Sequence, residues 1–325
     1  MYGTVIFTAI IIISTFFASH ILTKGWIFAA KKFGLVGKDM NKAKSVSCAE
    51  AGGIAVLFST IFGIFFYVFF KTFIWRSATH FVEVLAIACT LLLAGFLGFI
   101  DDILGWKKGL AQWQKPLFTI PIAIPLAVLN ASQTNLTIPF FGNVDFGLYF
   151  PLILVPVAIV GASNGFNMLA GLNGLEAGMG AIILGTLTII LLKSAPWLAL
   201  LTCLCTASLL AFLLFNWYPA KVFPGNCLTY TIGALIGAVA ILSDATTSAI
   251  ILFLPYFAEF VLKAKSKFKG ESFGVPLQDG TLKPPEKISS LTHIFMRFAK
   301  TEKRTVQAIL GMELMLAVFV LFLYY

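Results

Sequence analysis

The chain of 325 residues is 59% hydrophobic and only 11% charged, and its formal net charge is +9. This apolar content exceeds what a soluble domain can bury, so the composition excludes a soluble globular protein and predicts an integral membrane protein. Five cysteines without metal-ligand spacing and three isolated histidines indicate neither a disulfide framework nor a zinc site. We expect the membrane to be a partner of the chain, and nucleic acid not to be one.

Ten apolar runs of about the length of a membrane span follow one another along the chain. They lie near residues 3–23, 51–70, 81–100, 116–129, 149–166, 177–192, 197–215, 227–243, 246–262 and 306–325. We therefore expect an all-α integral membrane protein with about ten transmembrane helices, forming one domain over residues 1–325. The fourth and fifth runs are short and contain prolines, so these two helices are expected to be kinked or tilted.

The basic residues predict the orientation of these spans. Of the 23 Lys and Arg residues, 20 lie in loops that follow odd-numbered runs, most of them in the loops 24–50 and 263–305. Because basic residues favour the cytoplasmic side of a membrane, these loops are predicted to be cytoplasmic and both termini to lie outside. The stretch 130–148 on the other face has no basic residue and two N-x-S/T sequons, at Asn130 and Asn135. Because the polar loops gather on one membrane face, the sequence favours an enzyme that acts at that face over a channel.

A glycine- and asparagine-rich segment, NGFNMLAGLNGLEAG at 164–178, interrupts the apolar sequence. Its four glycines allow the backbone to approach a ligand closely. Its asparagines, Asn164, Asn167 and Asn173, each offer an amide acceptor and donors without charge. This combination suits a nucleotide or a phosphate-bound cation. An ordinary polar turn between two membrane helices is the alternative, because Asn and Gly are common turn residues.

Two adjacent carboxylates, Asp101 and Asp102, follow the apolar run AGFLGFI, where a helix is expected to reach the cytoplasmic interface. Adjacent carboxylates repel each other unless a cation is near. Mg²⁺ takes oxygen ligands and commonly acts together with substrate phosphates, so we expect it as the cofactor. The alternative is a helix end whose charges face water.

The sequence NMLAGLNGLEAG resembles the signature of the polyprenyl-phosphate N-acetylhexosamine-1-phosphate transferases of glycosyltransferase family 4, in its archaeal and eukaryotic form. The segments NKAKSVSCAEAGG, DD and NWYPAKVFPG extend the resemblance over nearly the whole chain. It implies a Mg²⁺-dependent transfer of N-acetylglucosamine 1-phosphate, or a related sugar 1-phosphate, from a UDP-sugar to dolichyl or another polyprenyl phosphate. The products would be lipid-diphosphate-sugar and UMP, as in the first step of glycan-lipid assembly for protein N-glycosylation.

The resemblance also implies roles for the residues near the two aspartates. Asp101 would orient or deprotonate the acceptor phosphate with support from Asp102, and Lys115 would contact the donor diphosphate. An interface anchor is the alternative for Lys115. Asn167 and Asn226 would ligate Mg²⁺. Asn226 stands where the family has an aspartate, so it removes one negative charge from the expected metal site.

Further substrate contacts are expected from the glycine-rich segment. Asn164 is a candidate, and the resemblance places Asn173 and Glu176 near the nucleotide base. The alternative for Glu176 is a carboxylate at a helix start, where the helix dipole favours it. With the predicted orientation, the site would lie on the cytoplasmic face of the cell membrane in a prokaryote, or of the endoplasmic reticulum in a eukaryote.

The loop 263–305 is expected to close over the sugar and diphosphate. The Arg-His-Arg cluster that the eukaryotic branch has there is absent, and His293 and Arg297 are the available substitutes. The four lysines at alternate positions from 263 to 269 are alternatively a solvated flank that binds anionic lipid. Pro255, shortly before the loop, predicts a bend in the ninth run that would open a groove for a lipid tail.

Two other functions stay open at this point. A transporter or flippase for lipid-linked or nucleotide sugars would need polar groups near the bilayer midplane, and we expect only Glu259 and Glu313, both near span ends. An inactive homologue is the other alternative, because of Asn226. The oligomeric state is open, and a homodimer is one option.

Overall fold

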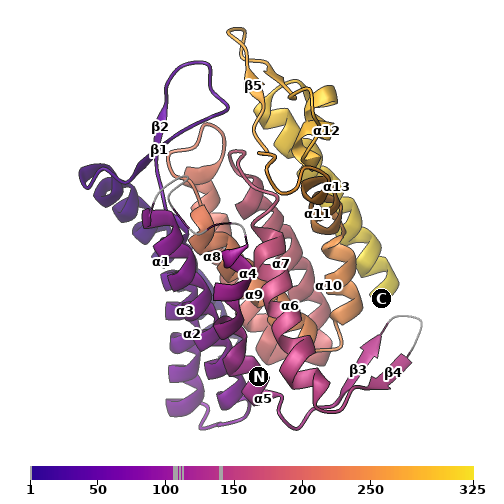
Figure 1. Ribbon diagram of the computed structural model, residues 1–325. Helices are drawn as coiled ribbons and strands as arrows, with labels where there is room; N and C mark the ends of the chain where they lie inside the picture. The colour runs from indigo at the N-terminus through magenta and orange to yellow at the C-terminus, as the bar shows by residue number, and fades with distance from the viewer. Residues whose placement is uncertain (1, 105–108, 110, 112, 139–141) are drawn as a thin grey trace.

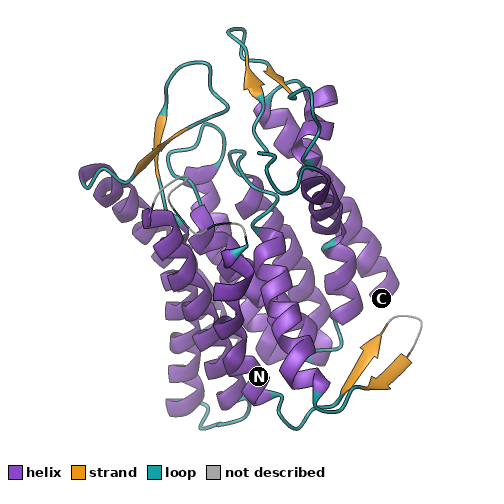
Figure 2. Cartoon of the chain, in the orientation of Figure 1, coloured by secondary structure: helices purple, strands orange, loops and turns teal. Residues whose placement is uncertain are grey.

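The computed structural model describes residues 2–104, 109, 111, 113–138 and 142–325. Long helices run side by side through most of the molecule, and short strand pairs lie at its two ends (Figures 1 and 2). The long helices are α1 (Tyr2–Lys32), α2 (Gly53–Phe73), α3 (Phe81–Leu104), α7 (Leu175–Ser194), α8 (Pro196–Asn216), α9 (Gly225–Leu242) and α13 (Glu302–Tyr324).

Among the described residues, these seven helices are long and apolar enough to cross a membrane. An eighth candidate is the broken pair α10 (Thr246–Leu252) and α11 (Leu254–Lys265). Two further apolar segments, 114–129 and 150–166, are shorter. All ten predicted runs therefore form helical segments, and the predicted helical membrane class is confirmed. The number of ten spans stays a prediction.

The two shorter segments are broken at their prolines. The pieces are α4 (Gln114–Thr119), the 3₁₀ turn η1 (Ile120–Ala123), α5 (Ile124–Leu129), the π-turn η2 (Phe150–Leu154) and α6 (Val155–Phe166). Pro121, Pro125, Pro151 and Pro156 each stand in the first two positions of a new piece, where a missing N–H removes no intrahelical bond. The predicted kinks are confirmed.

The ninth run is bent as Pro255 predicts. Helices α10 and α11 meet at an angle of 51° around Phe253, and Pro255 is the second residue of α11. The proline lacks an N–H and its ring excludes the carbonyl of the preceding turn, so one straight helix cannot pass through this point.

The described residues form three antiparallel strand pairs that were not predicted. They are β1 (Val36–Lys38) with β2 (Ser47–Ala49), β3 (Asn135–Ile138) with β4 (Gly142–Asp145), and β5 (Val275–Pro276) with β6 (Leu282–Lys283). The first and third pairs lie together with α12 (Leu291–Ala299) at the upper end of Figure 1, and the second lies at the lower end. The upper end carries the loops that are rich in basic residues, and both termini lie away from it.

Helix α9 forms the centre of the bundle and packs against α2, α3 and α6. Close approach to α6 requires small residues, since a side chain at Gly233 would collide with the backbone of α6 at Ala162. Many of the apolar side chains that remain exposed lie on outer helices, such as Phe28 on α1 and Phe322 on α13, where a membrane would cover them. This packing brings the end of α6 beside the beginning of α9.

The two acidic residues expected near span ends differ in position. Glu313 lies midway along α13 and is fully buried, and its carboxylate oxygens have no hydrogen-bond partner among the described residues. The prediction of its position was therefore wrong. Glu259 lies within α11, where Oε2 accepts hydrogen bonds from the Ser290 hydroxyl and the Leu291 N–H. Glu259 thus connects α11 to the start of α12.

Candidate active site

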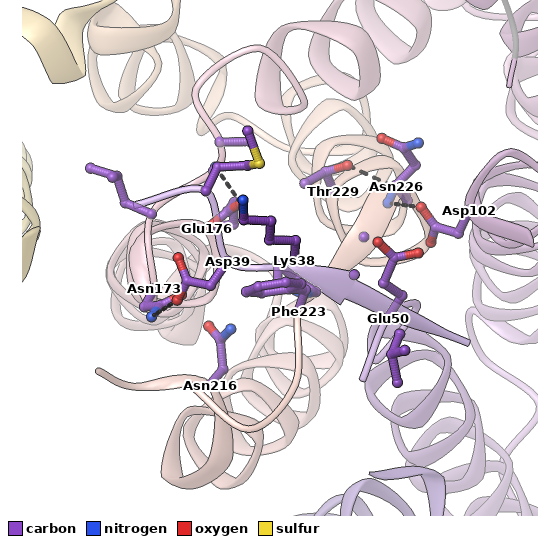
Figure 3. Close-up of a pocket in the computed structure, with 18 of the residues that line it drawn as sticks. Lys38, Asp39, Glu50, Asp102, Asn173, Glu176, Asn216, Phe223, Asn226 and Thr229 are labelled. Carbon is purple, nitrogen blue, oxygen red and sulfur yellow. Dashed lines mark hydrogen bonds between the residues drawn. The ribbon is translucent and has the colours of Figure 1, made fainter. Parts of the chain in front are cut away.

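Asp102 holds the beginning of α9. Its Oδ1 accepts the backbone N–H of Asn226 at 2.7 Å and its Oδ2 accepts that of Cys227 at 3.1 Å. The first N–H groups of a helix have no partner within the helix, and the helix dipole favours a negative charge beside them. Asp102 therefore fixes the position of Asn226, beside which it lies in Figure 3.

Gly225 permits this close approach. Its φ is +69°, a conformation that favours glycine, and a Cβ atom at this position would collide with the Asp102 carboxylate. The glycine of the sequence NWYPAKVFPG is thus needed for the contact between α3 and α9.

Asp101 joins three elements at the same end of the bundle. Its Oδ2 accepts a hydrogen bond from Asn226 Nδ2 at 2.8 Å and lies 2.9 Å from Lys115 Nζ on α4. Asp101 is only 4% exposed, which rules out the alternative that its charge faces water. The structure thus brings together Asp101, Asp102, Lys115 and Asn226, four residues that the sequence predicted for one site.

Asn167 faces the same cluster from the end of α6. Its side-chain oxygen accepts a hydrogen bond from the Thr229 hydroxyl at 2.8 Å, and Thr229 lies one turn after Asn226 on α9. The sequence analysis did not single out Thr229. Its spacing of three residues from Asn226 is the signal that would have placed both on one face of a helix.

A cavity of about 640 Å³, here called the strand-side cavity, opens between β1 and the cluster. The polar residues that line it are Lys38, Asp39, Glu50, Asp102, Asn167, Asn173, Glu176, Asn216, Asn226 and Thr229. Figure 3 shows Asp39, Asn173 and Asn216 on one side, Glu50 and Asp102 on the other, and Lys38 and Phe223 between them. Burial raises the pKa of the Glu50 carboxyl. Lys38, Asp39, Glu50 and Phe223 are further residues that sequence reasoning missed.

Glu176 and Asn173 form part of this wall. Glu176 Oε1 accepts the N–H of Gly171 at 2.8 Å, while Oε2 is buried without a hydrogen-bond partner among the described residues. Glu176 is also the second residue of α7, so the helix-dipole interpretation applies as well. Asn173 Nδ2 donates to Asp39 Oδ2 at 3.0 Å.

A second cavity, of about 730 Å³, adjoins the first and is here called the lysine cavity. Its charged lining residues are Lys115, Lys263, Lys267 and Glu271, and Asn164 also lines it. Both cavities are lined by Asn167, Ala170, Gly171, Asn226 and Phe273, so they meet at the two asparagines.

The lysines at the start of the loop 263–305 are not equivalent. Lys263 is buried, donates to the Gly270 carbonyl and the Ser272 hydroxyl at 2.8 Å each, and lies 3.5 Å from Glu259. The interpretation as a solvated flank is therefore wrong for Lys263. Lys267 is exposed and lines the lysine cavity.

An apolar groove of about 520 Å³ continues from the lysine cavity along the bent helix. It is lined by side chains of α6, α9, α10 and α11, among them Val157, Phe253, Phe257 and Phe260. The groove and the lysine cavity share Pro116, Asn164, Met168 and Phe260. The bend predicted from Pro255 thus lies beside a groove.

Neither His293 nor Arg297 lines the strand-side cavity, the lysine cavity or the apolar groove. His293 is buried, its Nδ1 accepts the Ser289 N–H at 3.3 Å, and its Nε2 donates to the Phe273 carbonyl at 3.1 Å. Burial lowers the pKa of His293 more than the bond to Phe273 raises it, so the ring is neutral at pH 7 and does not supply a cation. Arg297 is exposed on α12.

The oxygens at the junction of the cavities suit a metal that arrives with its substrate. Among the described residues, no group of three or more His, Cys, Asp or Glu side chains could hold a metal ion. The junction instead offers the amide groups of Asn167 and Asn226 with the Asp101 carboxylate beside them. Mg²⁺ usually keeps several waters and binds few protein oxygens together with substrate phosphates, so this set fits it.

The fold and the site define a membrane-embedded enzyme in which the strand-side cavity and the lysine cavity meet at one end of a helical bundle. Residues 84–244 match the profile of glycosyl transferase family 4. Two proteins provisionally named UDP-N-acetylglucosamine–dolichyl-phosphate N-acetylglucosaminephosphotransferase, from Saccharolobus solfataricus and Sulfolobus acidocaldarius, are each 40% identical over 311 residues. The alignments cover 94% of this chain and 94% and 93% of the two relatives.

A more distant relative is the phospho-N-acetylmuramoyl-pentapeptide-transferase of Halalkalibacterium halodurans, which is 34% identical over 210 residues, 62% of each chain. The chain therefore belongs to glycosyl transferase family 4. The resemblance that the glycine-rich segment indicated is confirmed over nearly the whole chain.

Proposed function

We propose that the protein transfers N-acetylglucosamine 1-phosphate from UDP-N-acetylglucosamine to dolichyl phosphate or a related polyprenyl phosphate, releasing UMP. The observation that carries this proposal is the meeting of two polar cavities at Asn167 and Asn226, with an apolar groove leading away from one of them. The strand-side cavity would take the nucleotide, the lysine cavity the phosphates and sugar, and the groove the prenyl chain. The names of the two archaeal relatives state the same donor and acceptor.

The reaction joins two anions. An oxygen of the lipid phosphate attacks the β-phosphorus of the UDP-sugar, and the bond from that phosphorus to the oxygen bridging to the α-phosphate breaks, so UMP leaves. Holding both phosphates in line within bonding reach supplies much of the catalysis. The junction of the cavities is where two such groups would meet, because Asn167 and Asn226 line both.

Each residue of the cluster has a distinct task in this proposal. Asp101 orients the acceptor phosphate or takes its proton, and Lys115, 2.9 Å from Asp101, offsets the charge that develops on the diphosphate. Asp102 keeps Asn226 in place through the two N–H groups that it accepts. Mg²⁺, held by Asn167 and Asn226, would neutralise charge on the diphosphate when it is bound.

The orientation in the membrane belongs to the same proposal. The two shorter apolar segments would complete ten crossings, with both termini outside and the site at the cytoplasmic face of the cell membrane or endoplasmic reticulum. The distribution of 20 of 23 basic residues supports this orientation, because the loops 24–50 and 263–305, which carry most of them, lie at the same end of the bundle as the site.

The decisive assay incubates purified protein with Mg²⁺, dolichyl phosphate and each of a panel of UDP-sugars, and measures UMP. We expect UMP to appear only when lipid phosphate and UDP-N-acetylglucosamine are both present. Uptake of UDP-sugar into sealed vesicles without UMP would contradict the proposal and support a transporter. Glu313, although buried midway along α13, lines none of the described cavities and so gives a transport pathway no support.

Filling the apolar groove should weaken acceptor binding selectively. Gly161 lines the groove, and a Cβ atom added there meets nothing within 4 Å, so the side chain of Gly161→Phe can start into the groove from this position. We expect the KM for a long-chain polyprenyl phosphate to rise by about tenfold or more, because burial of several CH₂ groups is lost. The KM for the UDP-sugar should change little.

The matched control is Gly311→Phe, at a glycine of α13 that also has open space around it and lines no described cavity. It should leave both KM values unchanged. An equal rise in the KM for a short-chain acceptor in Gly161→Phe would contradict the assignment of the groove to the prenyl chain.

A further inference from the structure

The segment 39–42, here called the strap, connects the β1–β2 hairpin to three distant parts of the chain. Asn41 Nδ2 donates to the Gly171 carbonyl at 2.8 Å, and Asn41 Oδ1 accepts the N–H of Gly274 at 3.1 Å. Lys42 contacts Glu302 at the start of α13. The strap thus ties together the glycine-rich segment, the loop 263–305 and the last helix.

Lys42 lies between two buried carboxylates. Its ammonium binds Glu302 Oε2, lies 3.3 Å from Asp39 Oδ2, and is 4.1 Å from the centre of the Tyr218 ring. The side chains of Asp39 and Glu302 are each only 3% exposed. Burial alone would lower the pKa of Lys42, but the two carboxylates outweigh this effect and raise it, so the lysine stays charged.

The same two carboxylates hold Asn173. Asp39 Oδ2 accepts from Asn173 Nδ2 at 3.0 Å, and Glu302 Oε1 accepts the Asn173 backbone N–H at 2.8 Å. Asn173 is 4% exposed and lines the strand-side cavity. The position of Asn173 in that wall therefore depends on two carboxylates, and Lys42 is the cation between them.

The strap fixes the neighbouring part of the wall as well. Gly171, which Asn41 holds, has a φ of +104°, and a Cβ atom there would come within 2.8 Å of the Phe273 ring. Phe273 precedes Gly274, the other residue that Asn41 binds, and it lines both polar cavities. Asn41 thus sets Gly171 and Phe273 relative to each other.

We propose that Lys42 is a positioning residue for the nucleotide, which holds Asp39 and Glu302 together so that both keep Asn173 in the wall of the strand-side cavity. The inference rests on the proposed function, because it assigns that cavity to the uridine nucleotide. Without Lys42, two buried carboxylates would face each other without a counter-charge. They would separate or take up protons, and the bonds to Asn173 would be lost. Acceptor binding and the chemical step would not change.

The test compares Lys42→Met with Lys44→Met. Lys44 lies in the same connection, is exposed and lines no described cavity, so it serves as the matched control. For Lys42→Met we expect the KM for the UDP-sugar and the Kd for UMP, measured by calorimetry, to rise about tenfold or more. The kcat at saturating donor and the KM for lipid phosphate should stay within about twofold of the wild type. Lys44→Met should match the wild type in all four quantities.

A second variant separates positioning from general damage. Lys42→Met/Glu302→Gln removes one charge of each sign, and the glutamine oxygen can still accept the Asn173 N–H. We expect this double variant to bind the nucleotide at least about threefold more tightly than Lys42→Met does, since residues 42 and 302 are in contact and their effects are coupled. Glu302→Gln alone should raise the donor KM about threefold, and it provides the test if Lys42→Met does not fold.

The outcomes that overturn the inference are specific. A donor KM within about twofold of the wild type in both Lys42→Met and Glu302→Gln would remove Lys42 from nucleotide positioning. An equal loss of affinity for both substrates, or a fall in kcat alone, would show that the pair of Lys42 and Glu302 only stabilises the fold. If the wild type itself released no UMP from any UDP-sugar, the proposed function would fail instead.

Discussion

Asp101→Asn is expected to lower the rate of UMP release by at least about 100-fold. The Asp101 carboxylate lies between Lys115 and Asn226, at the point where the acceptor phosphate is proposed to meet the donor. Asparagine has the same shape and keeps an oxygen that can accept the Asn226 hydrogen bond, so the loss would come from the missing charge. Initial rates with purified protein at saturating donor and acceptor measure the effect. Asn167→Ala should reduce turnover comparably.

Asp244→Asn is the matched control for Asp101→Asn. Asp244 is an exposed aspartate between α9 and α10, at the opposite end of α9 from Asn226, and it lines neither polar cavity of the site. Its substitution should leave turnover unchanged. Near wild-type turnover in both Asp101→Asn and Asn167→Ala would show that the site has been assigned wrongly.

Chelation of Mg²⁺ is expected to abolish UMP release, and added Mg²⁺ to restore it. Among the residues that the structure describes, no group of three or more His, Cys, Asp or Glu side chains could hold a metal, so the ion should bind weakly without the diphosphate. The metal is required in the proposal because two phosphate groups must approach each other. Full activity after chelation would contradict it.

The substitution Asn226→Asp tests the same proposed metal site by adding a carboxylate to it. Asn226 Nδ2 now donates to Asp101 Oδ2 at 2.8 Å, whereas an aspartate would place two carboxylates in contact. With Mg²⁺ these carboxylates should lower the metal concentration for half-maximal rate by about tenfold. When a chelator has removed the Mg²⁺, the two carboxylates should repel each other and lower the Tm of the variant relative to the wild type. An unchanged Mg²⁺ dependence would show that residue 226 is not a ligand. Turnover gained only in Asn226→Asp would support an inactive homologue.

The sequence was sufficient for the helices and for selecting polar residues that lie close together in the structure. Long apolar runs are a local signal, and each of the ten runs is helical in the structure. Each of five residues that we singled out stands in a short motif next to such a run, and the family resemblance suggested their roles: Asp101, Asp102, Lys115, Asn167 and Asn226. Their contacts with one another follow from the packing of α3, α4, α6 and α9, which no local pattern records.

The walls of the strand-side cavity could not be predicted in the same way. Asp39 binds Asn173 across 134 positions of the chain, and Lys42 binds Glu302 across 260. A loop without periodicity gives no indication of which distant partner it meets. His293 shows the converse error, because a histidine in a basic loop suggests a cation, whereas burial lowers the pKa of this ring more than its bond to the Phe273 carbonyl raises it.

The apolar groove and the strand-side cavity share no lining residue. If the groove takes the prenyl chain and the strand-side cavity the uridine, as proposed, a bound prenyl chain would leave the strand-side cavity open to a nucleotide. The acceptor could then stay bound while nucleotides exchange, so encounters with a scarce membrane-borne acceptor would not have to be repeated each time a donor dissociates.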